Sequence, residues 1–143
     1  MKITKEEVRN LFKHLEKGDA DSFFTNVSEN VDWTVMGTHP LAGHYTSLED
    51  FRQNTFNRLA PCLTAPIQLV LKTVFIDGDT AIVELQATSQ AKSGWDFDNQ
   101  YCWIIEFRDK IIVRVRAYLD SNMVARLIAE EEEESTKVYF NRG

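Results

Sequence analysis

The sequence predicts a single α+β domain in which three N-terminal helices pack on a curved, cone-shaped antiparallel sheet. Helix-period apolar patterns dominate the chain up to Pro61, and from Pro66 onward the apolar residues alternate with a period of two. Helices first and long strands after are typical of an α+β domain with its helices on one face of the sheet. The 143 residues are the length of one ordinary domain.

The first two helices are marked by their start signals. Thr4 and Glu7 have the spacing of a capping box, and an amphipathic stripe follows them. That stripe consists of Val8, Leu11, Phe12 and Leu15. Gly18 ends this helix, and Asp19 caps a second, short helix.

An isolated strand and a loop separate the second helix from the third. Residues 31–36 alternate, and we place this strand at an edge of the sheet because it lies apart from the other strands in sequence. Residues 37–43 contain two glycines and a proline and predict a loop. Ser47 opens the third helix, which must stop before Pro61.

Four consecutive strands with short connections predict an antiparallel meander. The strands are expected at residues 67–76, 80–91, 97–107 and 111–120, with turns at 77–78, 92–94 and 109–110. Strands this long usually twist and coil, so the sheet should curve toward its helices. Residues 1–129 then form the domain, including a short apolar helical stripe after Asp120.

Residues 130–143 are expected to form an acidic C-terminal tail. The glutamate run at 130–134 is typical of a solvated or disordered segment. The apolar residues Val138, Tyr139 and Phe140 either dock on this chain or a partner, or are disordered.

Composition excludes several function classes. The net charge of −6 argues against nucleic-acid binding, which needs clustered Lys and Arg. No apolar run approaches the roughly 18 residues of a membrane span, and the N-terminus lacks the apolar stretch of a signal peptide, so a cytoplasmic location is expected. Cys62 and Cys102 form no disulfide framework, and the three histidines have no metal-ligand spacing. No cofactor motif is present, so neither a cofactor nor a metal is expected.

Three short fragments carry a family resemblance: LEKGD at residues 15–19, the stretch 31–43 that opens on VDW, and VRAYLD at 115–120. With the order of the elements over residues 3–129, they resemble the nuclear transport factor 2-like superfamily. The similarity is to its SnoaL-like and ketosteroid isomerase-like branch. This resemblance implies a cone with a pocket between sheet and helices, and a homodimer formed through the sheet.

The resemblance does not extend to the best-known catalytic residues. The three roles of the steroid isomerases fall near Leu11, Trp33 and Trp103, where no side chain can abstract a proton and Leu11 cannot stabilise an oxyanion. Limonene epoxide hydrolases of the superfamily have an arginine and an aspartate that match Arg116 and Asp120. Their other catalytic pair falls near Ala87 and Ser89, which cannot replace it.

Polar candidates for the site come from the last strand and from the loop. SnoaL-type cyclases use an acidic pocket residue, and Asp120 is its counterpart here; it is either a general acid or base, or the cap of the following helix. Arg116 lies roughly 13 Å from Asp120 along the strand, and Tyr118 between them either donates to a ligand carbonyl or packs. His39 and His44 flank the loop at the expected pocket mouth, where they either transfer protons or are ordinary surface histidines.

Two hypotheses follow for the function. In the first, Trp33, Tyr101 and Trp103, together with Arg116 and Tyr118, line a pocket for a largely apolar carbonyl compound. Asp120 and His39 then support cofactor-free cyclase, isomerase or hydratase chemistry. In the second, the cone is filled by side chains and the protein is a non-catalytic dimerisation or interaction module, with Val113 and Val115 on the outer face of the sheet.

Overall fold

The computed structural model describes the backbone of residues 2–141 and the side chains of residues 2–132. The helices are α1 (Lys5–Glu16), α2 (Ala20–Phe24), α3 (Leu48–Asn54), α4 (Phe56–Leu59), the 3-10 helix η1 (Ala60–Cys62) and α5 (Ser121–Asn141). The strands are β1 (Val27–Val35), β2 (Gly43–Tyr45), β3 (Leu69–Asp77), β4 (Thr80–Ala87), β5 (Ser89–Gln90), β6 (Asp96–Phe97), β7 (Gln100–Arg108) and β8 (Ile111–Leu119). None of the helices described is both long and apolar enough to cross a membrane.

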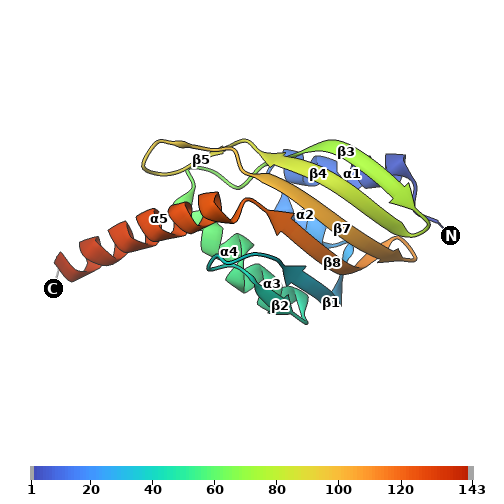
Figure 1. Cartoon of the computed structure of the whole chain (residues 1–143), viewed down its shortest axis with the longest axis horizontal. Helices are drawn as coiled ribbons and strands as arrows, with labels where there is room; N and C mark the ends of the chain where they lie inside the picture. The colour runs from blue at the N-terminus through green and yellow to red at the C-terminus, as the bar shows by residue number, and fades with distance from the viewer. Residues whose placement is uncertain (1, 142–143) are drawn as a thin grey trace.

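The predicted α+β fold class is confirmed, but the sheet is not antiparallel throughout. Six strands follow in the order β2-β1-β8-β7-β4-β3 and curve around the helices α1 to α4 (Figure 1). The meander from β3 to β8 is antiparallel, but β1 runs parallel to β8. The sheet is therefore mixed.

The strand β1 does not lie at the edge that the sequence predicted for it. The short strand β2 pairs antiparallel with it on its outer side, with Trp33 opposite Tyr45. Three residues are too few for an alternating pattern to be recognisable, so β2 gave no signal in the sequence. The predicted strand 80–91 is also divided, since β4 ends at Ala87 and the hairpin β5–β6 forms a separate two-stranded sheet.

The predicted helix starts are confirmed. Thr4 and Glu7 form both hydrogen bonds of a capping box on α1, and Asp19 and Ser47 cap α2 and α3. The third helix is interrupted at Thr55, whose hydroxyl donates to the Phe51 carbonyl at 2.6 Å. The backbone of Thr55 leaves the helical conformation, with φ −125° and ψ −87°, and this separates α3 from α4.

The inner face of the sheet and the helices form one aromatic core. Trp33 stacks on Phe51 with ring centroids 3.9 Å apart and meets Trp103 edge-to-face at 5.3 Å. Val115 is fully buried in this core, so its predicted place on the outer face was wrong. The alternation of β8 turns Val115, Ala117 and Leu119 inward.

Helix α5 continues through the residues that the sequence assigned to a tail. Its backbone is helical to Asn141, and Glu130, Glu131 and Glu132 each form a hydrogen bond with another part of the domain. The side chains of Val138, Tyr139 and Phe140 lie outside the described residues, so their predicted docking or disorder stays untested.

Candidate functional site

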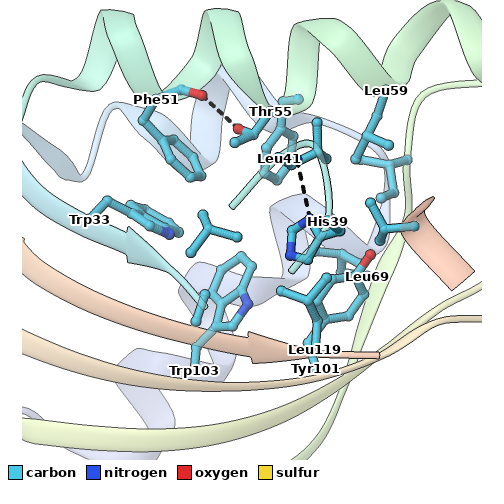
Figure 2. Close-up of a pocket in the computed structure, with 15 residues that line it drawn as sticks. Trp33, His39, Leu41, Phe51, Thr55, Leu59, Leu69, Tyr101, Trp103 and Leu119 are labelled. Atoms are coloured by element: carbon cyan, nitrogen blue, oxygen red, sulfur yellow. Dashed lines mark hydrogen bonds between the residues drawn. The ribbon is translucent and has the colours of Figure 1, made fainter. Parts of the chain in front are cut away.

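A narrow apolar cavity of about 40 Å³ lies at the open end of the cone, between the sheet and the segments that cover it (Figure 2). The strands β1, β3, β7 and β8 line one side, and α3, α4, the loop at 37–42 and the start of α5 line the other. Of the seven site residues predicted from the sequence, four line it: Trp33, His39, Tyr101 and Trp103. None of its fifteen lining residues is an acid, a lysine or an arginine.

Three buried hydrogen-bond donors surround this cavity without a partner among the described residues. They are the indole Nε1–H groups of Trp33 and Trp103 and the hydroxyl of Tyr101. The two tryptophans are 0% and 3% exposed, so water in bulk does not reach their nitrogens. In Figure 2 both indole nitrogens lie on the ring edges that face the middle of the cavity. A buried polar group without a partner is uncommon in proteins and requires an explanation.

The hydroxyl of Tyr101 acts as a neutral donor. Burial raises the pKa of Tyr101 well above its ordinary value, and the neighbouring Asn99 amide opposes this only weakly. The two groups do not meet in hydrogen-bond geometry, since the Asn99 Nδ2 atom also has no partner among the described residues. At neutral pH the phenol therefore keeps its proton and can offer it to an acceptor in the cavity.

His39 holds the loop over the cavity with both ring nitrogens. The Leu41 backbone N–H donates to Nδ1 at 3.2 Å, so Nδ1 carries no proton, and Nε2–H donates to the Met36 carbonyl at 3.0 Å. The ring is 7% exposed. In this arrangement His39 shapes the cavity wall, and neither nitrogen is available to a ligand.

The other three predicted site residues lie away from the cavity. Arg116 and Tyr118 are on the outer face of the sheet, where Arg116 lies 3.8 Å from Glu106 and Tyr118 is 43% exposed. Asp120 is exposed and accepts hydrogen bonds from the backbone N–H groups of Asn122 and Met123 at 3.1 and 3.3 Å. Of its two predicted roles, the structure shows the helix cap.

Other chemical groups do not form a second site at this end of the cone. His44 is exposed and pairs with Asp32 at 2.7 Å between β2 and β1. Within the described part of the chain, no three His, Cys, Asp or Glu side chains come together as a metal site would need. Leu41, Leu59 and Leu119 also line the cavity, although the sequence did not predict it, because nothing in a sequence distinguishes an aliphatic residue that lines a cavity from one in the core.

The family is shown by comparison with known proteins. A family model described as a SnoaL-like domain matches residues 8–115 of the chain. The chain belongs to the SnoaL-like domain family. A curated relative, the dimerizing cyclase phiC of a fungal species (strain ATCC 74256), is 26% identical over 134 residues. That alignment covers 91% of this chain and 59% of the relative, so this SnoaL-like chain spans well under two thirds of that protein's length.

Solved structures confirm the fold. An NTF2-like protein from Burkholderia thailandensis has a TM-score of 0.72 and 21% identity, covering 86% of this chain and 95% of its own. TerC, co-crystallised with polyporic acid, has a TM-score of 0.67 and 16% identity, with the same coverage. At these identities the likeness shows the SnoaL-like and NTF2-like fold and no more.

Proposed function

We propose that this SnoaL-like protein binds a largely apolar carbonyl compound in the cavity of its cone. Any reaction there is of the cofactor-free isomerase or cyclase type. The observation that carries the proposal is the set of three buried donors around one apolar cavity. The family, the relative named a cyclase and the structural neighbour co-crystallised with polyporic acid support the same class of role.

A carbonyl oxygen fits this cavity because it accepts hydrogen bonds and carries no charge. Leaving a buried donor unpaired costs about 1–3 kcal/mol, and an acceptor on the ligand recovers part of this. The same donors would stabilise the negative charge that develops on a carbonyl oxygen when an enolate forms or a carbon–carbon bond closes. A charged carboxylate fits less well, since no cation lines the cavity to pair with it.

The cavity residues supply donors rather than a base. No aspartate or glutamate lines the cavity, and both nitrogens of His39 are engaged by the backbone. A proton removed from the substrate must therefore go to another group of the substrate or to water. This requirement favours cyclisation of a compound that already carries an acidic C–H or O–H group over isomerisation by a protein base.

A titration with two small ligands that share one ring skeleton tests this proposal. We expect 1-indanone, followed by tryptophan fluorescence, to bind about two- to twelve-fold more tightly than indane, which lacks the carbonyl, because one such hydrogen bond contributes about 0.5–1.5 kcal/mol. Equal affinities would contradict a role for the donors. Absence of binding by both, with no small molecule retained in native mass spectrometry of the purified protein, would favour the second candidate function.

The second candidate is a dimerisation or interaction module, and the outer face of the sheet favours it. Phe75 is 57% exposed and pairs across the strands with Ile82, which is 38% exposed. We propose that this face forms a homodimer whether or not the cavity binds a ligand. Sedimentation analysis of the protein and of a Phe75→Ser, Ile82→Ser variant tests it, with a monomeric variant as the expected result.

A further inference from the structure

Helix α5 begins at the open end of the cone, between two parts of the rim, and its later turns project away from the domain (Figure 1). Figure 1 shows it running between the β5–β6 hairpin on one side and α4 on the other. Val124 in its first turns lines the cavity, and Leu127 and Ile128 are buried below it. The helix is therefore part of the cavity wall as well as its cover.

Arg58 of α4 joins three segments that line the cavity. Its Nε and Nη2 atoms donate to the two carboxylate oxygens of Glu132 on α5, at 2.8 and 3.0 Å. Its third nitrogen, Nη1, donates to the Pro40 carbonyl in the loop at 37–42, at 3.2 Å. A bidentate arginine–carboxylate pair fixes both distance and orientation. One side chain thus connects α4, α5 and the loop that carries His39.

The two preceding glutamates attach α5 to the opposite part of the rim. Glu130 accepts hydrogen bonds from Trp95 Nε1 and from Arg126 Nε, each at 2.9 Å, and the Arg126 guanidinium also lies 4.0 Å from the Trp95 ring centroid. Glu131 accepts from the Ser93 backbone N–H at 3.1 Å. Three consecutive glutamates therefore hold one helical turn to both sides of the opening.

The size of the cavity makes this attachment functionally important. A cavity of about 40 Å³ is much smaller than the roughly 150 Å³ of an engineered protein cavity that admits benzene. A ring compound can enter only after part of the wall moves. Val124, about two turns before these glutamates on the same helix, belongs to that wall.

We propose that the Arg58–Glu132 pair is a clasp that keeps α5 closed over the cavity, and that its opening admits the carbonyl ligand. Arg58 is thus a positioning residue that sets the rate of ligand entry and exit. The proposal rests on the ligand-binding function given above. The pair is partly exposed, with 36% and 41% of the two side chains accessible. Its loss should therefore raise the population of the open state about two- to five-fold.

Cys62 offers a reporter of opening that needs no ligand. It lies on η1, which α5 contacts, is 2% exposed, and its thiol donates to the Arg58 carbonyl at 3.6 Å. With Cys102→Ser as background, Cys62 is the remaining thiol of the chain. Its rate of reaction with the neutral disulfide 4,4′-dithiodipyridine then measures how often the surface beneath α5 becomes accessible.

Two variants separate opening from a simple change in charge. Burial raises the pKa of Cys62, and the carboxylates of Glu132 and Glu131 raise it further, whereas Arg58 lowers it. Charge alone would therefore make Glu132→Gln react faster and Arg58→Gln react more slowly. Opening of the clasp makes both react faster, by about two- to five-fold. The matched control is Asp21→Asn, which breaks an ion pair of 2.8 Å with Arg52 outside this rim and should leave the rate unchanged.

The ligand measurement distinguishes the clasp from the binding function. In Glu132→Gln, stopped-flow association and dissociation rates of 1-indanone should rise by the same factor, with little change in Kd. A slower or unchanged thiol reaction in Arg58→Gln, or an equal acceleration in Asp21→Asn, overturns the clasp even where 1-indanone binds. Faster labelling of Cys62 in both clasp variants, without any binding of 1-indanone, would support the role of the Arg58–Glu132 pair in keeping α5 closed. The same result would overturn the proposed ligand.

Discussion

Replacing Tyr101 with phenylalanine should stabilise the protein and weaken its ligand at the same time. The substitution removes a buried hydroxyl without a partner and keeps the ring, which packs edge-to-face with Trp103 at 6.4 Å. Burying an unpaired polar group costs about 1–3 kcal/mol. Because the missing oxygen leaves a small void, we expect the free energy of unfolding to rise by the lower end of this range, about 1 kcal/mol. In a chain of this length that gain raises Tm by about 3–4 °C.

The matched control is Tyr45→Phe, the same chemical change at a hydroxyl that has a partner. The Tyr45 hydroxyl donates to the Leu41 carbonyl at 2.8 Å, so its removal should destabilise the fold by about 0.5–1.5 kcal/mol. Urea unfolding followed by tryptophan fluorescence measures both variants. Titration with 1-indanone measures the second effect of Tyr101→Phe, an affinity about two- to twelve-fold lower.

The two expected effects of Tyr101→Phe have opposite signs, since stability rises while the affinity for 1-indanone falls. A general packing defect would lower both stability and affinity. Destabilisation of Tyr101→Phe by as much as Tyr45→Phe would show that the hydroxyl already has a partner within the fold. Greater stability with unchanged 1-indanone affinity would show that Tyr101 is unpaired but does not contact the ligand.

Three further predictions concern the surroundings of the cavity. Asp120→Ala should cost about 1 kcal/mol of stability in urea unfolding as a lost helix cap, with 1-indanone affinity unchanged; a loss of affinity would restore its proposed role in the site. Arg58 holds the pKa of Glu132 below its ordinary value of 4.5, so the carboxylate stabilises the fold above that value and ceases to do so as the pH falls through the lowered pKa. The difference in unfolding free energy between wild type and Glu132→Gln should shrink over that range, and a difference that persists in acid would exclude the ion pair as its cause. Gly37→Ala should destabilise the fold more than Gly94→Ala in the same assay, because both glycines have φ above 100° but only at Gly37 would a Cβ atom clash with Ser121 Oγ. Equal losses of stability would assign the whole effect to backbone strain.

The sequence predicted the elements of this fold better than their pairing. Thr4, Asp19 and Ser47 are local signals, since each caps its helix through a hydrogen bond to a backbone N–H three residues on. The turn at Asp109 and Lys110 is equally local, and both residues adopt a positive φ there. The parallel pairing of β1 with β8 joins residues about eighty positions apart, and no local pattern specifies it.

The apolar half of the candidate site followed from alternation, whereas the polar half came from the family resemblance. Trp33, Tyr101 and Trp103 share the inward face of their strands, and all three line the cavity. Arg116 and Tyr118 share the opposite face of β8, because the alternation there turns its odd-numbered apolar residues inward. The alternation in the sequence therefore predicts that these two side chains point away from the cavity. The match to the VRAYLD motif led to the opposite prediction, which was wrong.

The three unpaired donors favour a ligand over a cone that is merely filled. At about 1–3 kcal/mol each they would remove several kcal/mol from a stability that is ordinarily about 5–15 kcal/mol. The edge-to-face contact of Trp33 with Trp103 offsets part of this at most, since an N–H group over an aromatic ring is a weak hydrogen bond. A cone that served only as a dimerisation scaffold would be more stable with phenylalanine at position 101, where the ring is kept and the unpaired hydroxyl is removed. The donors stabilise the protein only when an acceptor occupies the cavity. The changes in stability and in ligand affinity of Tyr101→Phe measure the cost of the unpaired hydroxyl and its contribution to binding.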